Sequence, residues 1–318
     1  MQWLPPVVIP LEEIRRARER IGDDVLRTPL VPIGETGRIW LKLECLQPVG
    51  SFKLRGALSA IRAASARELT DGVVTASAGN MAQGVAWAAR AVGVPARVIA
   101  PADAPRAKLD RVEALGAEIV PVAHEEWWRA MVERGREGVE GLFVHPVADE
   151  AVMAGNGTIG LELAEDAPEF DSVVVPWGGG GLTTGIASAL DALRPEVRVV
   201  TAEPETAAPL AAAFAAGEPR EIEFGRSWVD GAGGRELLPG MWELARELVD
   251  EAVAVPLAEV EEAVRVLAAR AHVVAEGAGA LALAVALHRE DRCVCIVSGG
   301  NIDAAVLARI LAGAEPGL

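Results

Sequence analysis

The chain has 318 residues, of which 51% are hydrophobic and 24% are charged, so it is long enough for two globular domains with a substantial core. Thirty Lys and Arg against 46 Asp and Glu give a net charge of −16, which repels nucleic acid and anionic lipid and argues against either as a partner. Three cysteines cannot form a disulfide framework and have no zinc-ligand spacing, and no uncharged apolar stretch reaches the ~18 residues of a membrane span.

The first half of the chain predicts a helix, a strand and then an alternating series. Residues 11–21, LEEIRRARERI, place apolar side chains at helical spacing, and residues 39–46, IWLKLECL, alternate as a strand does. A short apolar strand followed by a helix then occurs three times, with strands expected over 72–76, 96–101 and 117–122. Such a βαβαβα run favours parallel strands joined by right-handed crossovers.

A second series begins near residue 158. It predicts helices over 158–166, 182–193, 260–271 and 279–290, and strands over 171–176, 197–204 and 292–300. Residues 204–252 have the weakest periodicity and are expected to form loops and irregular helices along one rim. The pattern predicts an α/β fold with two doubly wound parallel-sheet domains. Ligands of such folds bind at the carboxyl ends of the strands.

The first candidate for chemistry is Lys53, in SFKLRGA at residues 51–57. It follows a Pro-Val-Gly break at an expected helix start, between Phe52 and an apolar residue. A poorly solvated lysine loses its proton more easily, and a neutral amine is the nucleophile that forms imines with aldehydes. Taken alone the signal is weak, because most lysines simply solvate a helix face.

The second candidate is the glycine run PWGGGGLTTG, residues 176–185, between an expected strand and an expected helix. Its glycines allow the backbone to approach an anion, and the N–H groups at the start of the helix favour phosphate. The run lacks the Lys-Ser/Thr ending of a P-loop and fits the dinucleotide fingerprint GxGxxG poorly, so a compact phosphate monoester suits it better than a nucleotide. A flexible turn is the plain alternative.

Two further motifs follow expected strands. SAGNMAQG, residues 77–84, places Ser77 and Asn80 at a helix start, where they could receive a carboxylate or simply cap the helix. VSGGNID, residues 297–303, places the neutral hydroxyl of Ser298 after the last strand, where a plain turn is the alternative.

In this order and spacing, the four motifs resemble the fold-type II pyridoxal-phosphate enzymes, in the branch of the threonine/serine dehydratases (ammonia-lyases) and serine racemases. RTPL at 27–30, LKLECLQPVG at 41–50, AGNGTIGLEL at 154–163 and EGAGALALA at 276–284 extend the resemblance from residue 27 to residue 303. It implies a tryptophan synthase β-like fold. Residues 1–70 and 146–318 would form a large cofactor-binding domain, and residues 71–145 a small domain with the substrate loop.

The resemblance also implies roles for individual residues. Lys53 would hold pyridoxal 5′-phosphate as a Schiff base and act as the catalytic base on the substrate's α-proton. The other cofactor-binding residues would be Phe52, Asn80, Gly178, Gly179, Gly180, Gly181, Leu182 and Ser298. The substrate carboxylate would be received by Ser77, Asn80 and Met81. Glu276, in EGAGA, would either orient the cofactor or cap a helix.

These residues favour β-elimination from L-threonine or L-serine, giving ammonia and 2-oxobutyrate or pyruvate. Ser298 is a neutral partner for the cofactor's pyridine nitrogen, which makes the ring a poorer electron sink and suits ejection of a leaving group from Cβ. Ala78 stands where racemases of the branch carry a serine, so racemisation is expected to be weak or absent.

Other functions stay open at this point. Met81 replaces the family's usual histidine, which leaves substrate preference open and makes a hydroxyaspartate or ectoine-pathway dehydratase credible. A serine racemase-like enzyme, a cofactor-free binding protein and a nucleotide-binding oxidoreductase are further alternatives.

The remaining expectations concern ligands and surroundings. The family's divalent-cation site resembles AEPETAAP, with Glu203 and the carbonyl of Ala207 as ligands, but Pro209 replaces an acidic ligand, so no metal is expected. The partners expected are an amino-acid substrate and a second copy in a homodimer, with no nucleic acid and no membrane. Without the pattern of a signal peptide, the protein is expected to be cytoplasmic.

Overall fold

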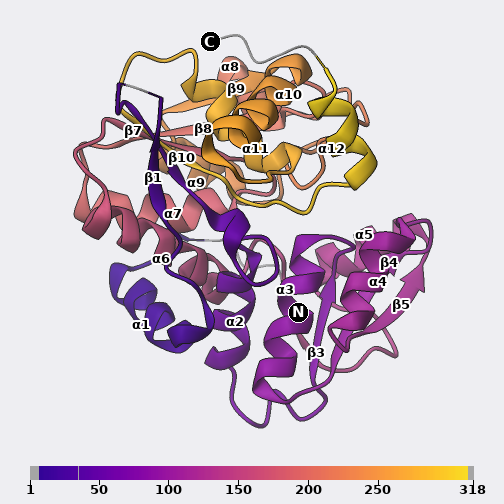
Figure 1. The fold of residues 1–318 in the computed structure, drawn as a ribbon. Coiled ribbons are helices and arrows are strands. Elements are labelled where there is room, and N and C mark those ends of the chain that lie inside the picture. The colour runs from indigo at the N-terminus through magenta and orange to yellow at the C-terminus, as the bar shows by residue number, and fades with distance from the viewer. Residues whose placement is uncertain (1–6, 35, 314–318) are drawn as a thin grey trace.

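The computed structural model describes residues 7–34 and 36–313, and its strands form two sheets in two lobes (Figure 1). The larger sheet has the order β1 (Leu30–Ile33), β2 (Ile39–Lys42), β10 (Cys293–Ile296), β7 (Ser172–Pro176), β8 (Arg198–Pro204), β9 (Glu251–Val255). The smaller sheet has the order β5 (Glu118–Val122), β4 (Ala96–Pro101), β3 (Val73–Ala76), β6 (Leu142–Phe143). All neighbours run parallel except β1 and β2. The α/β fold class with two parallel sheets is therefore confirmed.

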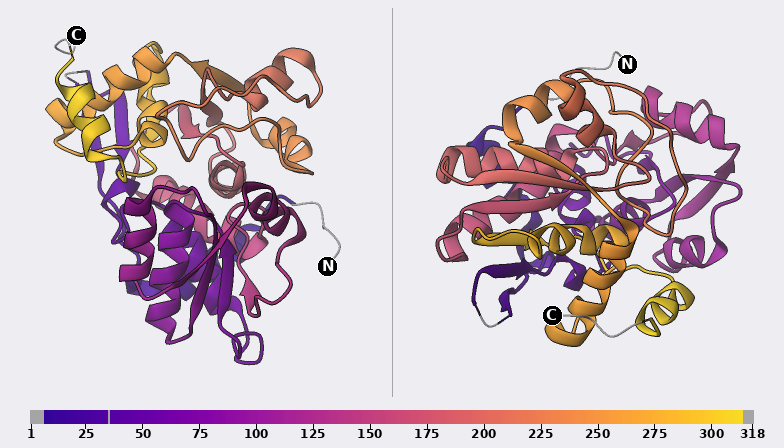
Figure 2. Two further views of the ribbon diagram at one scale, coloured as in Figure 1. Left: turned by 90° about the vertical axis from the view of Figure 1, so that its right-hand side faces the viewer. Right: turned by 90° about the horizontal axis from the view of Figure 1, so that it is seen from above.

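The larger sheet is apolar on both faces, because successive side chains of each strand enter different cores. Val173 and Val175 pack with α7 (Gly181–Leu193) and α9 (Met241–Leu248), whereas Val174 packs with α10 (Leu257–Val266) and α11 (Gly277–Ala286). Cys293 and Cys295 share the α10–α11 face and are fully buried. Figure 2 shows these helices around the sheet, with α12 (Ala304–Leu311) outside α10.

The smaller sheet is covered in the same way. α3 (Asn80–Val92) and α4 (Arg106–Ala114) pack on one face, and α5 (His124–Glu133) packs on the other. Helix α2 (Lys53–Ala63) adds its apolar side chains to the core of the α3–α4 face. The resemblance assigns α2 to the large domain, which includes residues 1–70, although α2 packs in this core of the smaller sheet. The boundary between residues 70 and 71 and the other domain limits stay predictions.

A group of helices connects the two lobes. Helix α6 (Glu150–Asp166) contacts α1 (Leu11–Ile21), α2 and α7. The close approach depends on glycines of α6: a Cβ at Gly155 would lie 2.5 Å from the carbonyl oxygen of Arg55 on α2, and one at Gly157 would lie 2.8 Å from that of Gly185 on α7. Lys53, the first residue of α2, is thus held on a helix packed against both lobes.

Most predicted elements are present, and the differences have local causes. Helix α6 begins at Glu150 instead of residue 158, because Asp149 caps it by accepting hydrogen bonds from Ala151 N and Val152 N. Residues 204–252 contain two helices, α8 (Pro209–Ala216) and α9, and the region ends in the edge strand β9. The predicted helix over 260–271 ends in a π-helical stretch, Leu267–Ala271. No helix in the described part of the chain is long and apolar enough to cross a membrane.

Candidate active site

The four motifs meet where parallel strands end. Three strands of the larger sheet lead at their carboxyl ends into motifs: β2 into the lysine segment (residues 49–57), β7 into the glycine run and β10 into the Ser298 loop (residues 297–303). In the smaller sheet, β3 leads into the asparagine loop (residues 77–84). The lysine segment pairs directly with the Ser298 loop: Phe52 N donates to Ser298 O at 3.0 Å, and Gly300 N donates to Gly50 O at 2.8 Å. Ser298 is 3% exposed, so its hydroxyl lies inside this junction.

Lys53 is the lysine least constrained by carboxylates. Its Nζ donates to the carbonyl oxygen of Pro146 at 2.7 Å and lies 5.1 Å from the centroid of the Phe52 ring. The chain has only two other lysines: Lys42 is buried against Glu162, and Lys108 pairs with Asp230. Burial lowers the pKa of Lys53 to about 8, although the charge of Glu276 opposes the change. Lys53 therefore loses its proton more easily than an exposed lysine does.

The glycine run forms an open set of backbone donors. Gly180 has a φ of +95°, which bends the chain between β7 and α7. None of the N–H groups from Gly178 to Thr183 donates to another described residue, and the buried hydroxyl of Thr183 has no described partner either. Adjacent unpaired N–H groups at the start of a 13-residue helix suit a phosphate dianion. The residues present thus fit the phosphate of the expected cofactor.

Residues 145–148 lie between the lysine and the glycine run. Pro146 accepts the hydrogen bond from Lys53, and a Cβ at Gly181 would lie 2.5 Å from the carbonyl oxygen of the next residue, Val147. His145 stabilises this turn, because its Nδ1 accepts from Val147 N at 3.0 Å and from Ala148 N at 2.9 Å. Burial, with the charges of Arg134 and Lys53, lowers the pKa of His145 to about 3, so the ring is neutral.

The asparagine loop is bound to the other lobe through Asn80. Its Nδ2 donates to Glu276 Oε1 at 2.6 Å, and its Oδ1 accepts from Asn301 Nδ2 at 2.7 Å. Glu276 is the N-cap residue of α11, but its carboxylate makes no cap hydrogen bond to the helix and instead accepts from Asn80. Burial, followed by the charge of Asp230, raises the pKa of Glu276 to about 7.

The two other predicted substrate residues lie differently. The Ser77 hydroxyl accepts from Gly79 N at 3.2 Å and is partly buried. The Met81 side chain is 2% exposed and packs in the core shared by α2 and α3. Only the backbone of Met81 is thus available to a ligand, so the side chain that replaces the family's histidine does not line the site. The assigned roles of Ser77 and Met81 stay predictions.

A buried ion-pair network beneath Lys53 was not predicted from the sequence. Arg55 is fully buried and donates to Glu44 and Glu162, and Lys42 pairs with Glu162. Burial alone would raise the pKa of Glu44, but Arg55 outweighs it and keeps that pKa low. The sequence does contain a signal for this network, because its charged residues all lie within the motifs LKLECL, SFKLRGA and AGNGTIGLEL that carry the family resemblance. The network attaches the first turn of α2 to β2 and α6.

Glu203, the candidate ligand at the position of the family's divalent-cation site, has a carboxylate that is bound by backbone N–H groups. Its fully buried carboxylate accepts from Ala211 N at 2.8 Å and from Leu210 N at 3.2 Å, at the start of α8. Burial raises its pKa to about 8. That no divalent metal binds here stays a prediction.

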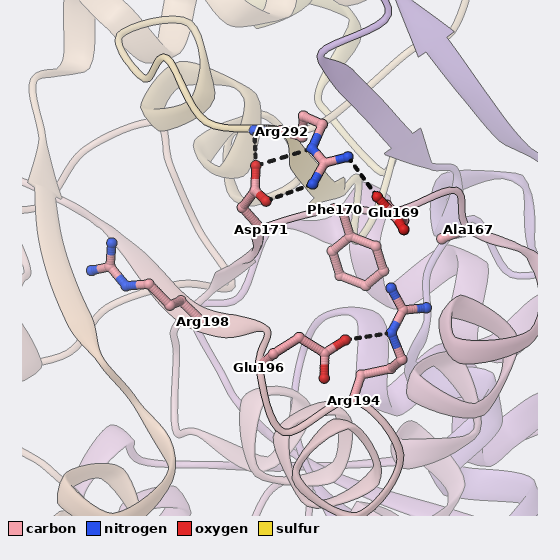
Figure 3. A pocket seen from close by; sticks show the side chains of 8 residues that line it. All are labelled: Ala167, Glu169, Phe170, Asp171, Arg194, Glu196, Arg198 and Arg292. Atoms are coloured by element: carbon pink, nitrogen blue, oxygen red, sulfur yellow. Dashed lines mark hydrogen bonds and ion pairs between the residues drawn. The ribbon is translucent and has the colours of Figure 1, made fainter.

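A pocket of about 720 Å³ lies at the opposite end of the larger sheet (Figure 3). Its lining residues precede or begin the strands, whereas the glycine run follows β7. Its arginines already have partners: Arg292 binds Asp171, Arg194 binds Glu196, and Arg198 binds Glu251. This pocket therefore does not provide an unpaired cation for an anionic substrate.

Comparisons with known proteins agree with this arrangement. Residues 21–299 match the family model described as "Pyridoxal-phosphate dependent enzyme". The chain is 40% identical to an L-threonine ammonia-lyase from Thermotoga maritima over 315 residues, 96% of this chain and 78% of that protein. Among solved structures, maize serine racemase matches with a TM-score of 0.88 at 33% identity over 95% of this chain and 97% of that one. A T.th. threonine deaminase matches with a TM-score of 0.81 at 37% identity, covering 92% and 98%.

Proposed function

This chain belongs to the family of pyridoxal-phosphate dependent enzymes, and we propose that it is an ammonia-lyase acting on L-threonine or L-serine. The products would be ammonia and 2-oxobutyrate or pyruvate. The observation that carries the proposal is Lys53: a partly buried lysine with no carboxylate partner among the described residues, beside a run of unpaired backbone N–H groups. An aldehyde-bearing phosphate monoester suits both features.

Pyridoxal 5′-phosphate, when bound, supplies the aldehyde that joins to an amine and the ring that withdraws electrons from the substrate's Cα. The N–H groups of Gly178, Gly179, Gly180, Gly181 and Leu182 would hold its phosphate, while Phe52, Asn80 and Ser298 would contact its ring. Ser77, Asn80 and the backbone of Met81 would receive the substrate carboxylate. Lys53 Nζ would take the α-proton, and the β-hydroxyl, on gaining a proton, would leave as water. Hydrolysis of the resulting imine would then release ammonia and the 2-oxo acid.

Two residues support elimination over racemisation. Ser298 offers a neutral hydroxyl, so no carboxylate keeps the ring nitrogen protonated, and chemistry that expels a leaving group needs less charge stored on the ring. Ala78, packed against the small-lobe core, offers no proton to the opposite face of the substrate. We therefore expect little or no D-serine from L-serine.

The chain's lysine content makes the test direct, because a trypsin digest has only Lys42, Lys53 and Lys108 to distinguish. The protein is incubated with pyridoxal phosphate, its visible spectrum is recorded, and the complex is reduced with borohydride and mapped by mass spectrometry. We expect a visible band and a pyridoxyl label on Lys53 only. L-threonine should perturb the band and yield 2-oxobutyrate.

A Lys53→Ala variant serves as the negative control and should show neither band nor product. A label on Lys42 or Lys108 instead of Lys53 would refute the assignment of the lysine. A band without 2-oxobutyrate or pyruvate would keep the cofactor but contradict the proposed substrates. D-serine formed faster than pyruvate would favour a racemase.

We also propose that the enzyme works as a homodimer in the cytoplasm. Three apolar side chains around the short helix η2 (Glu44–Leu46) support a protein partner: Leu26, Leu46 and Val274 are 46%, 44% and 48% exposed. The cysteines at 45, 293 and 295 are buried free thiols, which suits a reducing compartment. The test is a fusion of this chain to a reporter protein that has no leader of its own. Export of the fusion out of the cytoplasm would contradict the proposed location.

A further inference from the structure

Asn301, the last polar residue of the SGGN motif, has no role in the function proposed above. Its side chain joins three parts of the molecule. Its Nδ2 donates to Val49 O at 2.8 Å, ahead of Lys53, and to Asn80 Oδ1 at 2.7 Å in the asparagine loop. Its Oδ1 accepts from Arg111 Nη1 at 3.2 Å, on α4 of the small lobe. Both amide hydrogens of Asn301 are therefore used.

These bonds form a chain in which every donor points the same way. Arg111 donates to Asn301, Asn301 donates to Asn80, and Asn80 donates to Glu276 at 2.6 Å. The chain begins at a guanidinium, which can only donate, and ends at a carboxylate, which accepts when ionised. The guanidinium and the carboxylate at the two ends therefore fix the orientation of both amides. If either amide were turned over, two oxygens or two nitrogens would face each other in place of a donor and an acceptor. We name these four residues the amide relay.

Two glycines leave the space that the amide relay occupies. A Cβ at Gly50 would lie 2.8 Å from Asn301 Oδ1, and a Cβ at Gly299 would lie 2.3 Å from Glu276 Oε1. Gly299 also pairs with Ser51, two residues before Lys53. The relay is therefore packed against the backbone that carries the lysine.

We propose that Arg111, Asn301 and Glu276 are positioning residues that hold the Asn80 amide with its nitrogen facing the cofactor. One hydrogen of Asn80 Nδ2 binds Glu276, and the second has no acceptor among the described residues. That second hydrogen is the donor offered to the ring oxygen of pyridoxal phosphate, a hydrogen-bond acceptor. With the amide turned over, Asn80 would present its carbonyl oxygen to that oxygen and repel it. This inference rests on the proposed function, because it assumes that Asn80 contacts the cofactor.

The relay itself can be tested without cofactor, because the chain has only three asparagines, at 80, 156 and 301. Protein labelled with ¹⁵N in the asparagine side chains gives three NH₂ signal pairs, assigned by Asn→Ser substitution. Arg111→Leu should displace the Asn301 pair strongly and the Asn80 pair more weakly. Asn156, which donates to Gly181 O outside the relay, is the internal reference and should not move.

Arg106→Leu is the matched control, because it removes the same charge from the same helix at a residue paired with Asp110 and Glu113. It should leave all three pairs in place. Unchanged Asn80 signals in both Arg111→Leu and Asn301→Ser would overturn the relay. Displacement of all three signal pairs by Arg106→Leu would mean that the asparagine signals respond only to the net charge of α4. That result would also overturn the relay.

The second measurement is cofactor affinity, followed by the visible band or by tryptophan fluorescence during titration of the apoprotein. We expect Asn301→Ser to raise the Kd for pyridoxal phosphate about tenfold, the effect of one hydrogen bond of about 1.4 kcal/mol. Arg111→Leu, at the exposed end, should raise it less, and Arg106→Leu not at all. An unchanged Kd in a folded Asn301→Ser variant would overturn the positioning role.

The two proposals fail in different ways. If the native protein binds no pyridoxal phosphate, the proposed function fails and the cofactor-facing part of this inference fails with it, whereas the NMR result still decides the relay. If the native protein binds and eliminates normally but the Asn301 variants bind equally well, only the inference fails.

Discussion

At the scale of single residues, the surroundings of Lys53 distinguish it from the chain's other lysines. The sequence indicates a lysine after a Pro-Val-Gly break, and the structure shows how its surroundings differ from those of Lys42 and Lys108. Both of those have carboxylate partners, whereas Lys53 Nζ faces the carbonyl oxygen of Pro146, 93 residues further along the chain. A neutral acceptor does not favour the charged amine as a carboxylate would. The low pKa comes from burial, and the segment that covers Lys53 on this side lies far along the chain, so no local pattern could reveal it.

Glu276 gives a residue-scale prediction about pH. Burial raises the pKa of its carboxyl to about 7, the negative charge of Asp230 raises it further, and Lys108 lowers it. Asp230→Asn removes the raising charge, so the carboxyl should ionise at lower pH, and Lys108→Met should make it ionise at higher pH. The ¹⁵N-labelled Asn80 side chain, bonded to Glu276, reports the titration by NMR.

Both effects should shrink as salt is added, since Asp230 and Lys108 are 54% and 35% exposed. Glu276→Gln should abolish the titration of the Asn80 signals near pH 7. Shifts of the same sign in both charge variants would contradict the electrostatic explanation.

At the scale of elements, prediction from sequence worked best where the apolar pattern of an element is clear, either as a continuous run or as a stripe at helical spacing. β7 and β10 lie inside the sheet and read as apolar runs, and the predicted helix at 11–21 matches α1 with its buried stripe of Ile14, Ala17 and Ile21. β9 was missed because it is an edge strand whose first four residues are not buried, which leaves no clear alternation. β1 is absent from the predicted elements because it has only four residues and contains Pro32.

The contact between α6 and α2 gives a prediction at this scale. In Gly155→Ala, the new methyl group would lie 2.5 Å from the Arg55 carbonyl oxygen and 2.7 Å from Ser59 Cβ, so α2 must move away. Overpacking of this kind costs about 1–3 kcal/mol of unfolding free energy. Because Lys53 begins α2, cofactor affinity should fall as well. Denaturant unfolding of the apoprotein and titration with pyridoxal phosphate measure the two effects.

Gly234→Ala is the control for the added methyl group, because its nearest atom would be Glu236 O at an ordinary 3.4 Å. It should change the unfolding free energy by less than about 0.5 kcal/mol. Equal losses in the two variants would show that the α2–α6 contact is not the cause.

At the scale of the whole molecule, the sequence predicted two parallel sheets and the motifs at their carboxyl ends, but not how the lobes are joined. The joining contacts have long sequence separations: Lys108 to Asp230, Arg111 to Asn301, and Asn80 to Glu276. Each pairs a residue of the asparagine loop or α4 with one more than 120 positions later. Periodicity describes an element and its faces, so it contains no information on such pairs.

The proposed homodimer gives a prediction at this scale. Sedimentation equilibrium should give twice the 33.3 kDa of one chain. Leu46→Asp and Val274→Asp place charges among the exposed apolar side chains around η2, and each should weaken the dimer, because burying an unpaired charge is costly. Val132→Asp, on α5 of the small lobe, is the control and should sediment as the parent does. A monomeric parent protein would contradict the proposal, and a dimer unaffected by both charges would place the interface elsewhere.

The position of β10 has a consequence for how the protein is made. This strand, the last along the described chain, lies between β2 and β7 and pairs with both. On the ribosome, β2 and β7 are therefore synthesised long before the strand that joins them, and the Ser298 loop that pairs with the lysine segment emerges later still. The smaller sheet draws all its strands from residues 73–143 and can form while synthesis continues. The nascent larger sheet therefore carries two unpaired inner edges until β10 has been translated, and we expect the chain to be most prone to wrong strand pairing during this period.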